Sequence, residues 1–98
     1  MPWNSVVEYP FNAHFIKECA PAESGVYALC DADKWIYIGD AANLKLKLLS
    51  HLEPGTNRQI DQATPTTFSF ELCLPQERAR RLEQLTDELH PIVALNVA

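Results

Sequence analysis

Two tyrosines stand in short apolar runs, in positions from which their hydroxyl groups could act together. Tyr27 closes the run Gly25-Val26-Tyr27, and Tyr37 opens the run Tyr37-Ile38-Gly39 ten residues later. A phenol can give or take a proton, but its ordinary pKa lies near ~10. A tyrosine that orients or deprotonates water at neutral pH therefore needs help, which a nearby metal ion or lysine could give.

The register of the two strands that carry these tyrosines decides whether the phenols meet. Residues 25–30 and 35–39 are rich in strand-forming types and flank the polar break Asp31-Ala32-Asp33, so they predict a β-hairpin. Because side chains alternate along a strand, the phenols share one face only if the connection has an odd number of residues. We therefore predict a three-residue connection, 31–33, and both hydroxyls on the same face.

The other elements must flank this hairpin. Before the hairpin we expect a short helix near 11–16, and after it a helix from the N-cap Asn43 to Pro54-Gly55. A polar stretch with a helical turn near Ile60 then leads to a third strand over 66–73. A helix from Pro75 to about Leu89 and an extended tail over 91–96 complete the chain order. The order (α)ββαβα predicts an α/β (α+β) sandwich, with a central three-stranded antiparallel sheet flanked by helices.

Length and composition favour one globular domain that covers residues 1–98. Apolar residues make up 47% of the chain, which suits a folded core. The cysteines Cys19, Cys30 and Cys73 are far apart and form no CxxC pair, so no zinc site is predicted, and Cys30 and Cys73 are expected as small apolar residues. Free thiols favour a reducing compartment, the cytoplasm. We expect neither a leader peptide nor a membrane span.

The charge balance bears on the choice of partners. The net charge of −5 disfavours strong non-specific binding to DNA, because neutralisation of phosphates supplies most of that affinity. Arg78, Arg80 and Arg81 nevertheless crowd the start of the last predicted helix, where the helix dipole disfavours cations, and this placement suggests a binding role. Asp40, directly after Gly39, would repel a phosphate.

The two tyrosine runs resemble the two halves of the motif that defines the GIY-YIG nuclease superfamily. The segment after the hairpin is similar to the family pattern Asn-Leu-x-x-Arg-Leu, and the C-terminal part also carries family-like residues. The resemblance covers residues 24–96 and includes Asn43-Leu44, Lys47-Leu48, His51, Glu83, Pro91 and Asn96. Two departures are evident: Lys47 replaces the catalytic arginine, and the segment from Pro91 to Asn96 is about two residues longer than usual.

This resemblance implies a divalent-metal-dependent DNA endonuclease. Within it, Glu83 would hold one Mg²⁺ or Mn²⁺ ion, and Tyr27 or Tyr37 would orient or deprotonate the attacking water. Lys47 would take the place of the arginine that clamps the phosphate, and a point charge in place of a planar fork would weaken activity. His51 and Asn96 complete the implied catalytic set.

The main alternative is a catalytically inactive nuclease fold that serves as a binding or interaction module. Lys47, the negative net charge and the lack of a second DNA-binding domain favour it. A third possibility is action inside a larger complex that supplies the missing binding surface, and the partner could be another protein or a second copy of the chain. Each site residue also has an ordinary structural interpretation. The tyrosines could be sheet aromatics, Glu83 could pair with Arg80, His51 could favour the helix dipole, and Asn96 could cap the end of the fold.

Overall fold

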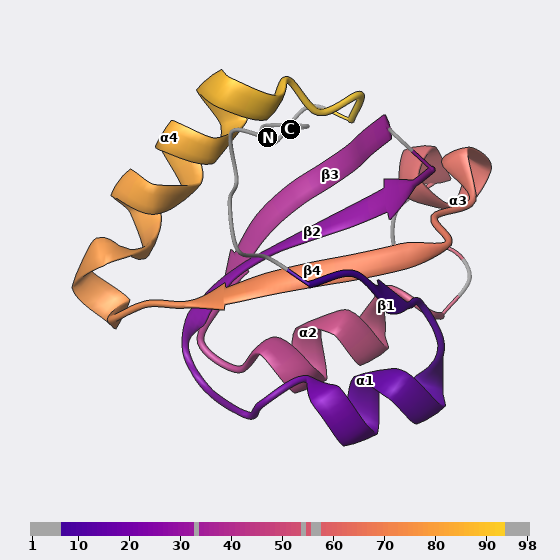
Figure 1. Ribbon diagram of the computed structural model, residues 1–98, viewed down its shortest axis with the longest axis horizontal. Coiled ribbons are helices and arrows are strands. Elements are labelled where there is room, and N and C mark those ends of the chain that lie inside the picture. The colour runs from indigo at the N-terminus through magenta and orange to yellow at the C-terminus, as the bar shows by residue number, and fades with distance from the viewer. Residues whose placement is uncertain (1–6, 33, 54, 56–57, 94–98) are drawn as a thin grey trace.

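A four-stranded antiparallel sheet forms the centre of the structure, a computed structural model that describes residues 7–32, 34–53, 55 and 58–93 (Figure 1). Its order is β1-β4-β2-β3, with β1 at Tyr9–Pro10, β2 at Gly25–Asp31, β3 at Lys34–Ala41 and β4 at Thr67–Leu72. The predicted three-stranded sheet is therefore wrong by one strand. The added strand, β1, has two residues and pairs only with the start of β4, so it is too short to show an alternating pattern in the sequence.

The helices follow the predicted order, and the predicted last helix begins with a separate 3₁₀ turn. The structure has α1 at Ala13–Cys19, α2 at Leu44–Ser50, α3 at Arg58–Ala63, the 3₁₀ turn η1 at Pro75–Glu77 and α4 at Arg78–Leu89. The expected N-cap of α2 is confirmed, because the Asn43 side chain accepts a hydrogen bond from the backbone N–H of Leu46 at 3.1 Å. The helical turn expected near Ile60 is the six-residue helix α3.

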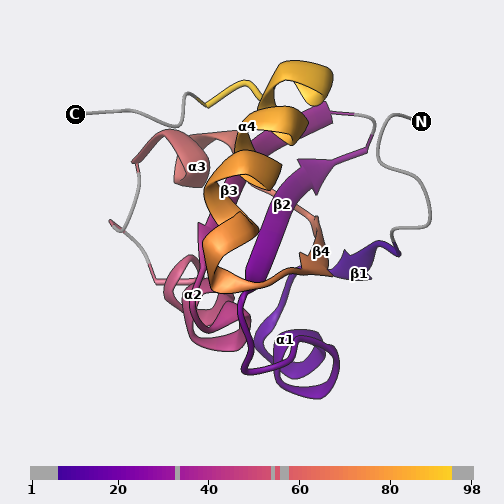
Figure 2. The ribbon, with the colours of Figure 1, turned by 90° about the vertical axis from the view of Figure 1, so that its left-hand side faces the viewer.

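The central strand β2 is buried on both faces, and its alternation divides the core into two layers. Its odd residues, including Tyr27 and Leu29, pack with α1, α2 and α3 on one face. Its even residues, including Val26 and Ala28, pack on the other face with Leu85 of α4. Figures 1 and 2 show α4 on one side of the sheet and α1 and α2 on the other. The sheet therefore separates α4 from the side chain of Tyr27.

In the β2–β3 hairpin both tyrosines lie on one face of the sheet, as predicted, but the register that puts them there differs from the predicted one. Tyr27 pairs with Gly39 and Leu29 with Tyr37, but the last pair is Asp31 with Lys34. Only residues 32 and 33 separate that pair, so the predicted three-residue connection is wrong; residue 33 itself lies outside the described residues. An irregularity after Leu29 adds one residue to β3 and restores the register. Both tyrosine side chains therefore lie on the same face of the sheet, as predicted.

The chain after α4 returns to the sheet. The backbone N–H groups of Ile92 and Val93 donate to the carbonyls of Trp35 and Ile36, at 3.0 and 2.8 Å. These bonds hold the end of the described chain beside β3, at the irregular part of the hairpin. The rest of the predicted extended tail, residues 94–96, lies outside the described residues.

The cysteines of the described chain are free thiols. Cys30 is buried, and its pKa is raised to about 12, mainly by burial, so it behaves as the small apolar residue that was predicted. Cys73 is only partly buried, against the core on the α4 side. None of the helices in the described ranges is both long and apolar enough to cross a lipid bilayer.

Candidate active site

Tyr27 and His51 form a buried polar pair beneath the sheet. The Tyr27 hydroxyl oxygen lies 2.7 Å from Nε2 of His51, within hydrogen-bonding distance. Tyr27 is completely buried in β2, and His51, at the C-cap of α2, is only 7% exposed. His51 continues the buried stripe of α2, one turn after Leu48. The helix that packs on this face of the sheet thus carries the imidazole to the phenol.

Tyr37 completes a cluster of three rings. Its ring centroid lies 6.1 Å from that of Tyr27 and 5.6 Å from that of His51, and the Tyr27 and His51 centroids lie 5.5 Å apart. Of the three side chains, Tyr37 is the one that is only partly buried. The cluster is therefore partly exposed at Tyr37, while Tyr27 and His51 are buried.

The cluster carries no charge at neutral pH. Burial raises the pKa of Tyr27 far above its usual value, and the neighbouring Tyr37 raises it further. Burial also raises the pKa of Tyr37, although the hydrogen bond with Tyr27 acts in the opposite direction. The pKa of His51 falls to about 4 through burial and through the charge of Lys47, against which Asp61 acts. Two protonated phenols therefore meet a neutral imidazole, which can accept a hydrogen bond from the Tyr27 hydroxyl.

Lys47 lies beside this cluster on the exposed surface of α2. It helps to line a shallow cavity of about 460 Å³, whose polar walls also include Asp40, Asn43 and Ser50. The carboxylate of Asp40 lies 3.7 Å from Nε of Arg78 in α4. This pairing offsets the repulsion that Asp40 was expected to exert on a phosphate.

Glu83 is exposed on α4 and has no hydrogen bond or ion pair with any other described residue. The structure brings Tyr27, Tyr37 and His51 together on one face of the sheet, whereas α4 covers the other face. The alternative ion pair of Glu83 with Arg80 is absent from the described chain, and Arg80 Nη2 lies 3.5 Å from Glu77 instead. Asn96 lies outside the described residues.

The described residues contain no group of three or more His, Cys, Asp or Glu side chains that could ligate a metal together. An exposed carboxylate such as that of Glu83 is a type of ligand that Mg²⁺ uses while it keeps most of its waters. The same helix also carries the exposed carboxylates of Asp87 and Glu88.

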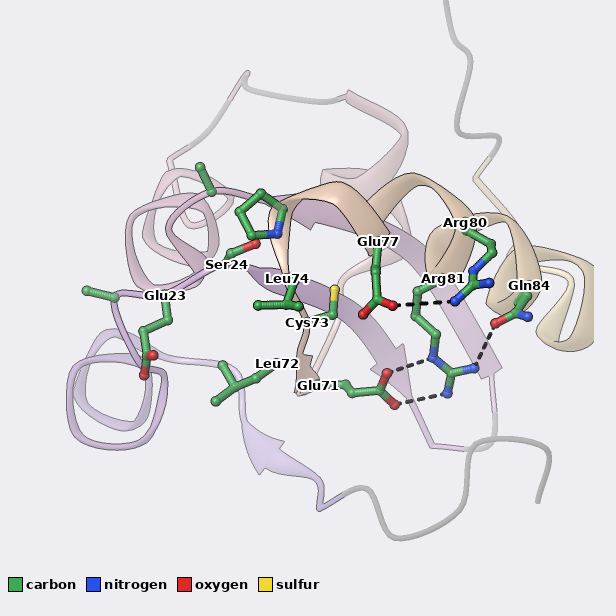
Figure 3. Close-up of a pocket in the computed structure, with 13 residues that line it drawn as sticks. Glu23, Ser24, Glu71, Leu72, Cys73, Leu74, Glu77, Arg80, Arg81 and Gln84 are labelled. Atoms are coloured by element: carbon green, nitrogen blue, oxygen red, sulfur yellow. Dashed lines mark hydrogen bonds and ion pairs between the residues drawn. The ribbon is translucent and has the colours of Figure 1, made fainter.

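The arginines at the start of α4 have acidic partners. Arg81 donates two hydrogen bonds to the Glu71 carboxylate, at 2.7 and 2.9 Å, and Arg80 pairs with Glu77 (Figure 3). These pairs line a cavity of about 790 Å³ between the end of β4 and α4. With Arg78 beside Asp40, the positive charge of the predicted binding cluster is largely balanced within the protein.

Two sequence comparisons, with models of protein families and with curated proteins, find no match. Solved structures do match, and they include the GIY-YIG N-terminal endonuclease domain of UvrC from Thermotoga maritima. An asparagine-to-alanine point mutant of that domain, bound to its catalytic divalent cation, matches with a TM-score of 0.69 and 26% identity, over 83% of this chain and 96% of the other. The magnesium-bound domain matches with a TM-score of 0.66 and 26% identity, over 78% and 91% of the two chains. The predicted resemblance is confirmed: over about 80% of its length, the chain has the fold of a GIY-YIG endonuclease domain.

Point mutants of the UvrC domain offer a second correspondence. In three of them a tyrosine is replaced by phenylalanine, and the three mutated tyrosines follow one another at intervals of ten and fourteen residues. Tyr27, Tyr37 and His51 have the same intervals. The cluster of three rings thus occupies positions with the spacing of three tyrosines that were mutated in the cation-bound domain.

Proposed function

We propose that this protein is a divalent-metal-dependent endonuclease that hydrolyses phosphodiester bonds in DNA. The observation that carries the proposal is the hydrogen-bonded Tyr27–His51 pair behind the accessible Tyr37, within a GIY-YIG fold. Support comes from the UvrC domain, which is an endonuclease domain with a catalytic divalent cation.

The ring cluster suits the activation of water. As water loses a proton to the Tyr37 oxygen, the proton of Tyr37 passes to Tyr27, and that of Tyr27 passes to Nε2 of His51. In this relay the imidazole of His51, rather than a phenolate, is the final proton acceptor, and its lowered pKa limits the rate of the transfer. The hydroxide forms a bond to phosphorus, the bond from phosphorus to the leaving oxygen breaks, and the leaving oxygen takes a proton from solvent.

Lys47 is the residue suited to stabilise the phosphate. It is exposed at the rim of the cluster, and its charge is near enough to depress the pKa of His51. An ammonium group provides a point charge rather than the planar fork of a guanidinium group, so it stabilises phosphate oxygens with less directional control. We therefore expect slow cleavage.

Glu83 is the residue that would hold the divalent metal, Mg²⁺ or Mn²⁺. A bound ion would supply charge stabilisation at the phosphate and at the leaving oxygen. The start of α4 meets the sheet edge at β3, where Arg78 pairs with Asp40, a residue whose charge also raises the pKa values of both tyrosines. DNA lying along this edge of the sheet would pass between the ring cluster on one face and Glu83 of α4 on the other.

The test is nicking of supercoiled plasmid at low salt with Mg²⁺ or Mn²⁺. We expect the wild type to nick the plasmid, and Tyr37→Phe and Glu83→Gln to lower the rate at least tenfold. Glu88→Gln, an exposed carboxylate later in the same helix, is the matched control and should keep the wild-type rate. Cleavage that persists at full rate in Glu83→Gln would contradict the metal-dependent mechanism.

A second candidate function is that of a catalytically inactive binding or interaction module, because the balanced charges of Arg78, Arg80 and Arg81 leave little positive charge for the binding of DNA by a nuclease. Fluorescence anisotropy with a labelled duplex over a range of salt concentrations separates the two functions. Salt-dependent binding without nicking by the wild type, with either metal, would assign the binding module. Nicking that Tyr37→Phe abolishes would assign the nuclease.

A further inference from the structure

The second ring nitrogen of His51 poses a separate question. Nε2 faces Tyr27, but Nδ1 is buried and has no hydrogen-bond partner among the described residues. Buried polar atoms in native proteins nearly always have a partner, either a protein group or an ordered water. The partner of Nδ1 matters because it decides which nitrogen of the neutral imidazole carries the hydrogen.

A cavity adjoins the imidazole. It has a volume of about 430 Å³, and its described walls are formed by Phe11, His51, Leu52, Ile60, Asp61 and Pro65. Among these described lining residues, only His51 and Asp61 have polar side chains. The cavity is large enough to hold water, and a histidine and a carboxylate in its walls provide polar partners for it.

Asp61 is held in place by the loop before α3. Its Oδ2 accepts a hydrogen bond from the backbone N–H of Gly55 at 2.9 Å. In the described part of the chain its other oxygen, Oδ1, has no hydrogen-bond partner, and no ion pair joins the carboxylate directly to His51. One carboxylate oxygen is therefore fixed by the backbone, and the Asp61 side chain lines the cavity that it shares with His51.

The charges around the imidazole are consistent with a role for this carboxylate. Tyr27 and Tyr37 face His51 as neutral phenols, and Lys47 on its own helix opposes a positive charge on the ring. Asp61 acts in the opposite direction, towards a protonated imidazole. It can thus offset part of the cost of moving a proton onto His51.

We infer that Asp61 is a positioning residue for His51: a water molecule in the shared cavity bridges Nδ1–H of His51 to the Asp61 carboxylate. This arrangement leaves Nε2 without a hydrogen, so it accepts from the Tyr27 hydroxyl, and Tyr27 can in turn accept from Tyr37. The opposite tautomer would place a hydrogen on Nε2 and block the relay. The catalytic importance of the bridge rests on the proposed function, but the bridge itself does not.

The experiment is ¹⁵N–¹H correlation NMR of the histidine rings in the full chain at pH 7, with the His51 signals assigned by loss in His51→Gln. The wild type should show His51 as the Nδ1–H tautomer. Asp61→Asn keeps an oxygen for the Gly55 N–H but removes the charge, and it should lower the ratio of Nδ1–H to Nε2–H by about fivefold, because charged acceptors bind hydrogens more strongly. Asp61→Glu should restore most of that ratio, and Asp87→Asn, an exposed acidic residue on α4, should not change it.

Two results would overturn the inference: a wild-type His51 that carries its hydrogen on Nε2, or an unchanged tautomer ratio in Asp61→Asn. Both are read from the ring signals in folded protein, without DNA or metal. A wild type that fails to nick plasmid but shows the expected ring signals would therefore contradict the nuclease and leave the bridge in place. Far-UV circular dichroism of each variant separates loss of the bridge from loss of the fold.

Discussion

Gly39 lies directly across the hairpin from Tyr27, and the Tyr27 ring occupies the space above the Gly39 backbone. A Cβ atom at Gly39 would stand 2.7 Å from the Tyr27 hydroxyl oxygen and 2.8 Å from the Tyr37 ring. Glycine at this position is therefore required by close packing rather than by backbone conformation. It allows both phenols to approach the same point.

Gly39→Ala should displace the Tyr27 ring and separate its hydroxyl from His51. Overpacking of a buried site typically costs about 1–3 kcal/mol, so we expect unfolding by urea at a lower midpoint together with loss of nicking. Ala42→Ser, at an exposed position three residues along, is the control and should match the wild type. An alanine variant with unchanged stability and activity would show that the ring cluster tolerates rearrangement.

Tyr27→Phe and Tyr37→Phe each remove one hydroxyl, but they should differ in their effects on stability and on nicking activity. Tyr27→Phe leaves Nε2 of His51 buried without its partner, so it should lower the free energy of unfolding by about 1–3 kcal/mol. Tyr37 is partly exposed, so its phenylalanine variant should be nearly as stable as the wild type, yet inactive. Urea unfolding and plasmid nicking, measured on the same preparations, give both quantities. Equal losses of stability would contradict the assignment of Tyr37 as the accessible phenol.

Much of the fold could be predicted from the sequence because local signals determine it. Asn43 caps α2 as expected, and the apolar spacing of Leu85 and Leu89 marks the buried side of α4. The strand β1 and the irregularity after Leu29 could not be predicted, because each depends on pairing with a strand distant in sequence or on a single extra residue. The prediction that both tyrosines lie on one face was thus correct, but the irregularity after Leu29 that places them there could not be predicted from the sequence.

The site shows the same division. The burial of His51 was open to prediction, because it follows Leu44 and Leu48 at helical spacing. Its contact with Tyr27 was not, because that distance depends on how α2 packs on the sheet. Asp61 was missed entirely, since it lies in a stretch that was expected to be mostly loop. The role of Glu83 stays a prediction that comes from resemblance.

Acidification should destabilise the protein through His51. The folded-state pKa of about 4 lies below the usual value of about 6.5, so the unfolded state binds the proton more tightly. The stabilisation is therefore present above pH ~6.5 and is lost as the pH falls towards ~4, with a total of about 3 kcal/mol. Urea unfolding from pH 4 to 7 should show a steeper pH dependence for the wild type than for His51→Gln. Parallel curves would contradict a buried neutral imidazole.

Lys47→Arg should raise the rate of plasmid nicking. The side chain is exposed at the rim of the ring cluster, so the exchange should alter the free energy of unfolding by no more than about 0.5 kcal/mol. A guanidinium group can donate two parallel hydrogen bonds to phosphate oxygens, which an ammonium group cannot, and we expect an increase of about tenfold. Lys45→Arg, which adds the same group on the same helix, is the control and should leave the rate unchanged. An equal increase in both variants would indicate a general gain in DNA affinity, and no increase in either would show that the phosphate does not lie beside Lys47.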